Sequence, residues 1–210
     1  MHAPGQDDRQ LSLDLKGGYA MGTARRLRRT GKRMHLQKAF FAILPEPDER
    51  ELIGPVLRRH CDAANIFSGR RPDRIWHISL AGVAQADTIP DEVFEQAAAL
   101  AGRVAMPAFD VAFDRLTSFG MGAGVRPLVI EGGEGLDGVR LLQGRLIDAV
   151  FRTESSAKPF NPHLTLAYSR THVTPTPIPP VRWRARSFVL VQSFVGQTRY
   201  AIRGQWPLSG

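Results

Sequence analysis

A short motif occurs twice in the chain, each time within a stretch that is predicted to form a β-strand, and no other pattern in the sequence restricts the fold as strongly. The first copy, HISL, begins at His77 within RIWHISLAGV, and the second copy, HLTL, begins at His163 within NPHLTLAYSR. Both copies follow the same order of predicted elements, a strand, a helix and then the strand that carries the motif. The sequence therefore predicts an α+β protein with two similar lobes, each a small sheet backed by helices.

The predicted elements form two repeats and a closing hairpin. The first repeat is expected to contain strands at 36–44, 75–83 and 109–120 and helices at 48–66 and 91–103. The second repeat and the hairpin are expected to contain strands at 126–132 and 163–169, a helix at 135–151, and two strands joined by a turn at 196–198. Asp48 is the predicted N-cap of the first helix, and Pro55 is expected to give that helix a kink or an early start. The proline-rich segment 171–182 is predicted to be a connector.

The positive charge is concentrated at the N-terminus. The formal net charge is +8, and residues 1–34 hold eight Lys or Arg against three Asp. We predict that residues 1–34 form a basic, disordered leader and that residues 35–210 form a single bilobal domain. A solvated tail, contact with RNA phosphates and a translation start at Met34 instead of Met1 are the open interpretations of the leader.

The amino-acid sequence and composition also exclude several classes of protein. No apolar run reaches the length of a membrane span, and the first residues lack the apolar centre of a secretory signal, so we expect no membrane and a cytoplasmic location. The single cysteine, Cys61, excludes an internal disulfide and a cysteine-based zinc site, and we predict that it is buried in the first helix. No Asp, Glu or Cys stands two positions from His77 or His163, so no metal is expected.

Strand geometry explains what the motif can do. Side chains at positions i and i+2 share a face, so His77 projects with Ser79, and His163 projects with Thr165. If the two faces meet across a groove, a neutral imidazole can accept a proton from water while a protonated imidazole donates one to a leaving oxygen. The two hydroxyls can donate hydrogen bonds to phosphate oxygens. This set of groups indicates phosphoester chemistry, although a single histidine in a strand is more often structural.

In these motifs and their order the sequence resembles the two-histidine (2H) phosphoesterases, and among them the RNA 2′,3′-cyclic phosphodiesterases, also called 2′-5′ RNA ligases. KAFFAILPEP resembles the opening strand of the family, WHISLAGV and NPHLTLAYS its signature strands, RPLVIEG its middle strand, and FVLVQSFVGQTRYAIRGQWPL its closing hairpin. The similarity extends from about Leu36 to Leu208. It implies a bilobal α+β fold, with two pseudo-symmetric antiparallel-sheet lobes backed by helices and a central cleft.

The resemblance also implies an activity, the opening of RNA 2′,3′-cyclic phosphate ends to 2′-phosphates without metal or cofactor. His77 and His163 would be the catalytic pair, and Ser79 and Thr165 would bind the phosphate. We expect His163 to be the base that activates water and His77 to be the acid that protonates the departing O3′. These roles exchange in the reverse reaction, 2′-5′ RNA ligation.

The sequence departs from the family at two positions. Ser79 stands where the family usually has threonine, and the hydroxyl is kept. Tyr168 stands where some members carry arginine, so either Arg126 or Arg170 supplies that positive charge or the substrate differs. Phe119 is a candidate stacking platform for a base, and Arg126 and Tyr168 are further candidates for substrate binding.

The expected partner is therefore an RNA or nucleotide substrate, bound by a monomer. Two alternatives stay open on the sequence. One is a 2H phosphodiesterase that acts on a small cyclic or 2′-5′-linked nucleotide. The other is a non-catalytic RNA-binding module in which the histidines only hold phosphate.

Overall fold

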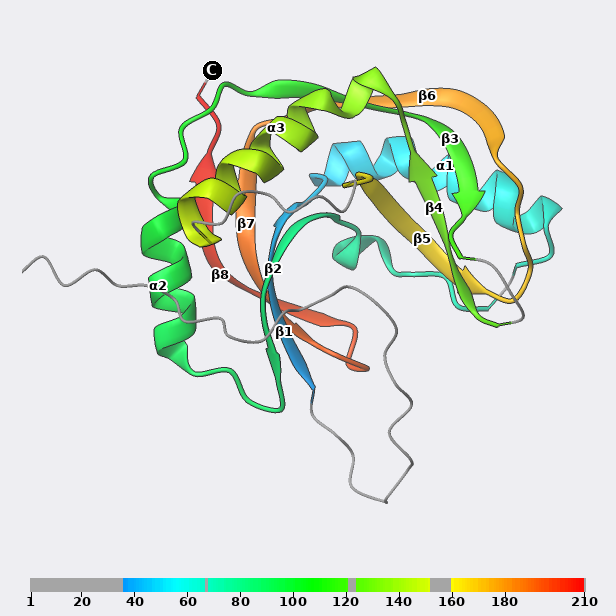
Figure 1. Cartoon of the computed structure of the whole chain (residues 1–210). Coiled ribbons are helices and arrows are strands. Elements are labelled where there is room, and N and C mark those ends of the chain that lie inside the picture. The colour runs from blue at the N-terminus through cyan, green and yellow to red at the C-terminus, as the bar shows by residue number, and fades with distance from the viewer. Residues whose placement is uncertain (1–35, 67, 121–123, 152–159, 210) are drawn as a thin grey trace, which may run out of the picture. The chain divides into compact units, whose positions relative to one another are not determined.

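Eight strands form one antiparallel sheet in the order β6-β3-β4-β5-β2-β1-β7-β8 (Figure 1). The computed structural model describes residues 36–66, 68–120, 124–151 and 160–209. The strands are β1 (Gln37–Ile43), β2 (Ile78–Ala86), β3 (Phe109–Ser118), β4 (Arg126–Glu131), β5 (His163–Ser169), β6 (Thr176–Ala185), β7 (Ser187–Phe194) and β8 (Arg199–Pro207). The helices are α1 (Pro47–Ala63), α2 (Asp91–Ala101) and α3 (Asp137–Leu146), with short helical segments η1 (Asp73–Ile75), η2 (Glu134–Leu136) and η3 (Ile147–Phe151). The predicted α+β class is confirmed.

The sheet consists of two four-stranded halves that meet at one ladder pair. Strands β6, β3, β4 and β5 form one half, and strands β2, β1, β7 and β8 form the other. The central strands β2 and β5 pair only at Ile78 and Leu164, and both of these side chains are fully buried. Next to its motif strand, each half carries the first strand of the same repeat, β1 beside β2 and β4 beside β5. The two predicted lobes are therefore joined edge to edge in a continuous sheet.

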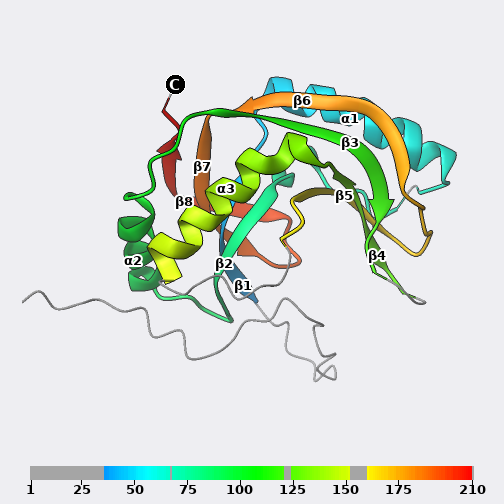
Figure 2. The ribbon, with the colours of Figure 1, turned by 45° about the horizontal axis from the view of Figure 1, so that its top comes forward.

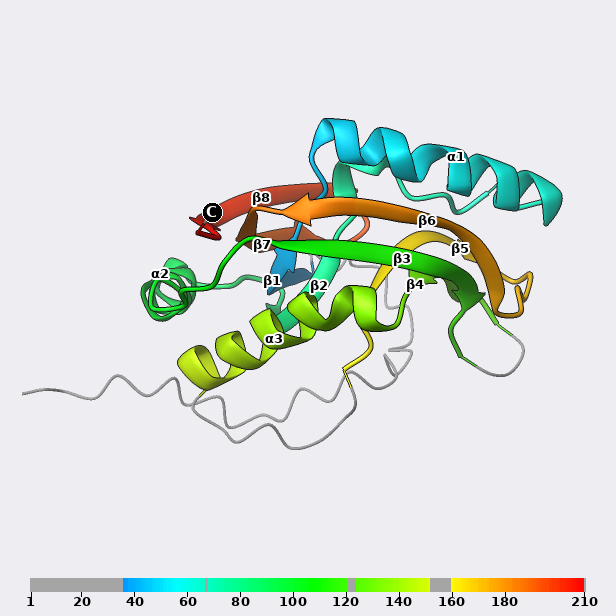
Figure 3. The same cartoon turned by 90° about the horizontal axis from the view of Figure 1, so that it is seen from above.

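The helices pack on the sheet through one large core. Buried side chains of α1, α2 and α3 belong to the same cluster as Phe41, Ile78, Leu80, Leu164 and Leu166. Helix α1 lies beside β6, α2 beside β8, and α3 beside β2 and β3 (Figures 2 and 3). Because strand side chains alternate between faces, burial of the motif leucines and isoleucine in this core directs the motif histidines and hydroxyls to the other face.

A second, smaller apolar cluster lies on that other face. Its buried members are Ala42, Val189 and Val191, with Phe40 and Tyr200 packed against them. Strands β1 and β7 therefore bury side chains on both faces, which explains why the continuous apolar run 39–44 forms a central strand. This cluster reaches the first motif through Phe40 and Tyr200.

Helix α1 begins one residue earlier than its predicted cap, so the prediction of Asp48 as the N-cap is wrong. The N-cap is Glu46, Pro47 is the first helical residue, and the Glu46 main-chain N–H donates to Glu49 Oε2 at 2.7 Å. Proline has no main-chain N–H, but at the first position of a helix that N–H would have no partner within the helix. The helix continues through Pro55 to Ala63.

The proline-rich segment 171–182 is only in part a connector, and that prediction is also wrong. Residues Thr176–Ala185 form β6, which pairs with β3 at the edge of the sheet. An edge strand tolerates Pro177, Pro179 and Pro180 because one side of its ladder has no partner strand that needs an N–H donor.

Several sequence predictions concern residues outside the described ranges. These are the basic leader at 1–34, the translation start at Met1 or Met34, and most of the polar loop before β5. None of the described helices is both long enough and apolar enough to cross a membrane. Cys61 is buried in α1, as predicted.

Candidate active site

The central ladder pair brings the two motifs together. In an antiparallel ladder the residues that flank a pair also lie opposite one another. Pairing of Ile78 with Leu164 therefore sets each motif histidine across from the hydroxyl residue of the other motif. Diagonal neighbours in such a ladder are about 7–8 Å apart, so the two imidazoles lie within range of one phosphate group. The four residues, all half-buried, are His77, Ser79, His163 and Thr165.

Both imidazoles are held by the same local contact. His77 Nδ1 lies 3.0 Å from the Ile75 carbonyl oxygen, and His163 Nδ1 lies 2.9 Å from the Asn161 carbonyl oxygen. A carbonyl can only accept, so Nδ1 of each ring carries a proton and donates it. Nε2 is then the atom that accepts a proton in the neutral ring and donates one in the protonated ring.

Aromatic side chains and an arginine surround His77. The ring centroids of Phe40 and Tyr200 lie 5.1 and 5.6 Å from that of His77. The Tyr200 hydroxyl lies 3.2 Å from His77 Nδ1, and it accepts a hydrogen bond from Arg71 Nη2 at 3.0 Å. Burial is the main cause that lowers the pKa of His77 to about 4; the bond to Ile75 opposes this shift, and the Arg71 and His163 charges add to it.

The surroundings of His163 include a carboxylate instead. Glu131 is the ladder partner of His163, and Glu131 Oε2 accepts a hydrogen bond from Asn161 Nδ2 at 2.8 Å. Arg115 Nε lies 3.0 Å from the other oxygen, Glu131 Oε1. Burial lowers the pKa of His163, while the bond to the Asn161 carbonyl and the negative charge of Glu131 both oppose this shift. The two catalytic candidates thus have opposite charged neighbours.

The hydroxyl residues are positioned by their neighbouring strands. Ser79 pairs with Ala42 of β1, and Thr165 pairs with Val129 of β4. Ala42 and Val129 are fully buried, so each hydroxyl residue is anchored beside an apolar partner.

The other predicted site residues divide into two groups. The Phe119 ring contacts His163 edge-on, with centroids 4.8 Å apart. Tyr168 is 44% exposed, and the Arg71 guanidinium lies 5.7 Å from the centroid of its ring. Arg126 pairs with Ser169, five residues along β4 from Glu131, which is about 16 Å at the usual rise of a strand. The structure therefore places Phe119 and Tyr168 near the motifs and Arg126 away from the histidines.

Sequence reasoning missed Arg71, whose position depends on the segment before η1. Arg70 forms a bridge with Ala167, and the Arg71 N–H donates to the Leu166 carbonyl oxygen at 2.8 Å. Gly69 has φ of 75°, and a Cβ there would collide with the carbonyl oxygen of Tyr168. Residues 69–71 therefore lie alongside residues 166–168 of β5, beyond the single pair that β5 forms with β2. The glycine before the Arg-Arg-Pro sequence was the available signal.

Tyr200 and Glu131 were also missed. Tyr200 reaches His77 from β8, which is separated from β2 by two strands of the sheet. Glu131 ends β4, and only its register with β5 identifies it as the neighbour of His163. An acidic residue at the end of the RPLVIEG strand was the only local signal for Glu131.

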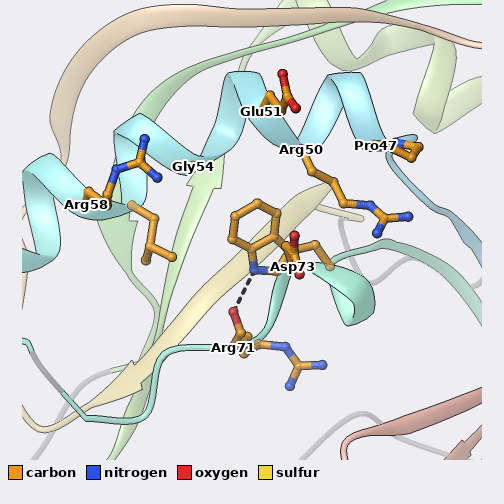
Figure 4. Close-up of a pocket in the computed structure, with 9 residues that line it drawn as sticks. Pro47, Arg50, Glu51, Gly54, Arg58, Arg71 and Asp73 are labelled. Atoms are coloured by element: carbon orange, nitrogen blue, oxygen red, sulfur yellow. Dashed lines mark hydrogen bonds between the residues drawn. The ribbon is translucent and has the colours of Figure 1, made fainter.

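A hollow of about 660 Å³ lies between α1 and the segment before β2 (Figure 4). Neither motif histidine lines it, and the Arg71 guanidinium points away from α1. Among the described residues, no group of three or more His, Cys, Asp or Glu side chains could hold a metal ion. The lining residues of the hollow are Pro47, Arg50, Glu51, Gly54, Leu57, Arg58, Arg71, Asp73 and Trp76.

Comparison with solved structures finds close similarity of fold. A crystal structure of Escherichia coli LigT complexed with 3′-AMP is 25% identical, with a TM-score of 0.64 over 83% of this chain and 99% of LigT. A crystal structure described as a phosphoesterase is 27% identical, with a TM-score of 0.65 over 83% of this chain and 99% of its own. TT0787 of Thermus thermophilus has the same fold at 23% identity, with a TM-score of 0.55 over 82% and 98% of the two chains.

Sequence comparison leads to the same family. A search of curated proteins gives no significant match. Residues 45–193, which include both motifs, match the model of the 2′-5′ RNA ligase superfamily. The resemblance to the 2H phosphoesterases is confirmed, and the chain belongs to the 2′-5′ RNA ligase superfamily.

Proposed function

We propose that the protein hydrolyses the 2′,3′-cyclic phosphate end of RNA to a 2′-phosphate, with His77 and His163 as acid and base. One observation supports the proposal most directly. The ladder pair between Ile78 and Leu164 puts the two motif histidines at diagonal positions, and their Nδ1 atoms make equivalent contacts. The 3′-AMP bound to E. coli LigT supports a nucleotide as the ligand of this fold.

The reaction needs two proton transfers and no metal. Nε2 of the neutral imidazole accepts a proton from water as the water oxygen attacks phosphorus. The P–O3′ bond breaks, and the protonated imidazole gives its Nε2 proton to O3′. The products are a 2′-phosphate and a 3′-hydroxyl. Ser79 and Thr165 donate hydrogen bonds to the non-bridging oxygens as negative charge grows on them. Every group comes from one chain, and we propose that the protein acts as a monomer. We also propose a cytoplasmic location.

Product analysis tests this function. An oligonucleotide with a 2′,3′-cyclic phosphate end is incubated with the protein in the presence of EDTA, and ³¹P NMR follows the phosphate. We expect complete conversion to the 2′-phosphate at the same rate with and without the chelator. A 3′-phosphate product, or loss of turnover with EDTA, would contradict the proposed chemistry, and binding without turnover would favour the RNA-binding module.

A small nucleotide is the second candidate substrate, and the 3′-AMP complex of E. coli LigT favours it. The same assay on a 2′,3′-cyclic mononucleotide, a 2′-5′-linked dinucleotide and cyclic-phosphate RNAs of increasing length separates the two candidates. An RNA enzyme should show a kcat/KM that rises with length, whereas a small-nucleotide enzyme should not.

The Thr165 hydroxyl should matter more than the size of its side chain. Thr165→Val keeps the volume but removes the donor, so kcat should fall by about 10²-fold, as for loss of one donor to a developing oxyanion. Thr165→Ser keeps the donor and should retain most activity. The matched control is Thr174→Val, at an exposed position between β5 and β6. Wild-type kcat in Thr165→Val would exclude the phosphate-binding role.

A further inference from the structure

We propose that the Arg71 guanidinium and the Tyr168 ring form a second phosphate subsite, which binds the phosphate on the 5′ oxygen of the terminal nucleotide. This inference rests on the proposed function and deepens it, because it names a group that the site recognises besides the cyclic phosphate. In an RNA end that group is the phosphodiester to the preceding nucleotide, and in a free nucleotide it is a 5′-phosphate. Both present non-bridging oxygens that suit a guanidinium.

Arg71 lies one step along the sheet beyond His77. The central ladder pair sets Thr165 across from His77. Beyond Thr165, residues 69–71 replace β2 as the neighbour of β5, whereas His163 lies in the other direction along the strand. A step of two residues along a strand is about 6.6 Å, which is similar to the separation of successive phosphates in an extended RNA strand. A phosphate held by the motifs therefore leaves the next phosphate within reach of Arg71.

A bulge in β5 turns Tyr168 toward the face of the motif histidines. The register between β4 and β5 shifts by one residue, and Leu166 and Ala167 are consecutive, fully buried side chains. The alternation of faces therefore restarts at Tyr168, which is 44% exposed. The Arg71 guanidinium lies 5.7 Å from the centroid of the Tyr168 ring, and it points away from α1 (Figure 4). The ring and the cation thus share the face of the motifs.

The Arg71 guanidinium has a positive charge that nothing nearby neutralises. Nη2 donates to the Tyr200 hydroxyl at 3.0 Å, but Nε is buried without a hydrogen-bond partner. Among the described residues no carboxylate forms an ion pair with this guanidinium, and Nη1, which is not buried, has no partner there either. A half-buried charge without a counter-charge is unfavourable. A bound phosphate would supply the negative charge and accept a hydrogen bond from Nη1.

The position of Arg71 behind His77 shows which phosphate it can bind. Nδ1 of His77 faces the Tyr200 hydroxyl at 3.2 Å, and Arg71 lies beyond that hydroxyl. The cyclic phosphate is expected at Nε2, on the opposite side of the imidazole. Arg71 is therefore assigned to a different phosphate. A cyclic end has no nucleotide on its 3′ side, so the neighbouring phosphate is the one on the 5′ oxygen.

Three substrates with the same reacting group test the subsite. Adenosine 2′,3′-cyclic phosphate has no second phosphate, its 5′-phosphorylated derivative has a phosphomonoester, and the adenosine dinucleotide with a 2′,3′-cyclic end has a phosphodiester. We expect kcat/KM to be about 10–100-fold higher for one or both of the last two, the range for hydrogen bonds to a charged group. The preferred substrate identifies whether the ligand is the monoester or the diester. Arg71→Met should abolish the preference, and Arg71→Lys should keep part of it.

The ratio of kcat/KM values separates contact with the substrate from a structural role. If Arg71 only supports Tyr200 and His77, Arg71→Met should slow all three substrates by the same factor and leave the ratio unchanged. The matched control is Arg74→Met, at an exposed position in η1, which should change neither the rates nor the ratio. An unchanged ratio in Arg71→Met, or equal kcat/KM of the wild-type protein for all three substrates, would overturn the subsite.

Tyr168 gives an independent test, because it is exposed and its replacement should not affect folding. Tyr168→Phe keeps a ring beneath the guanidinium and should retain the preference for the second phosphate. Tyr168→Ala removes the ring that orients Arg71 and should lower that preference. The same ratio in wild type and Tyr168→Ala would exclude Tyr168 from the subsite.

A binding measurement separates this inference from the proposed function. Isothermal titration calorimetry compares adenosine 2′-phosphate with adenosine 2′,5′-bisphosphate, and it needs no turnover. We expect the bisphosphate to bind at least about 10-fold more tightly to the wild-type protein, and this advantage should be lost in Arg71→Met. If no cyclic phosphate is hydrolysed, the proposed function fails, and the comparison still decides whether Arg71 binds a second phosphate. Equal affinities of the wild-type protein for the two ligands would overturn the subsite even where hydrolysis is observed.

Discussion

Replacing His77 or His163 with alanine should lower kcat for cyclic-phosphate hydrolysis by about 10²–10⁴-fold, the range that a general acid or base contributes. Each variant loses one of the two proton transfers, and neither imidazole can perform both because one must be neutral when the other is protonated. The measurement is single-turnover hydrolysis of a cyclic-phosphate oligonucleotide. Because the two residues act as a unit, the double variant should be little slower than either single variant.

The matched control for these changes is His172→Ala. His172 is exposed in the segment between β5 and β6, and it belongs to neither motif. Its replacement should leave kcat unchanged. Circular dichroism would check that the motif variants are folded. If folded His77→Ala or His163→Ala keeps wild-type kcat, the two-histidine mechanism is excluded.

The second large effect is on stability and comes from the pair that joins the two halves. Ile78→Ala should lower the free energy of unfolding by about 2–5 kcal/mol, the usual loss for a fully buried aliphatic side chain truncated to alanine. Ile78 is completely buried, and its pairing with Leu164 is the only ladder contact between β2 and β5. We also expect kcat to fall, because the cavity loosens the pair that fixes the positions of His77 and His163 relative to one another. Urea denaturation measures the first effect.

Ile202→Ala provides the comparison. Ile202 lies in β8 and is 47% exposed, so the same truncation should change the free energy of unfolding by less than about 0.5 kcal/mol. If the two variants lose the same free energy of unfolding, the pair between Ile78 and Leu164 contributes no more to stability than an exposed strand position does.

Local sequence patterns were sufficient to predict the motif strands, because the alternation of side chains between the two faces of a strand depends only on neighbouring residues. The burial of Leu80 and Leu166 and the half-exposure of His77 and His163 follow from it directly. The order strand, helix, strand occurs twice along the chain, and this repetition was sufficient to predict two related halves. The joining of these halves into one sheet required the register between β2 and β5, which no local pattern contains.

The charged neighbours of the histidines could not be predicted for the same reason. Arg71 reaches the site because the chain after Gly69 runs along β5, and Tyr200 reaches it from a strand near the end of the chain. Both contacts depend on long-range pairing. The family resemblance gave roles for the histidines from their positions in the motifs, whereas the charged residues around them are identified only by the three-dimensional contacts. Strand β6 was missed because proline content is a local signal against a strand, and only its place at the sheet edge makes the prolines acceptable.

The most direct test of the two-histidine site is a crystal structure of the protein with a 2′-phosphorylated nucleotide, the proposed product. We predict that Nε2 of His77 and Nε2 of His163 both lie about 3 Å from oxygens of the same phosphate group, with the Ser79 and Thr165 hydroxyls on its other oxygens. A phosphate bound by one imidazole alone, or bound in the hollow beneath α1, would contradict the account.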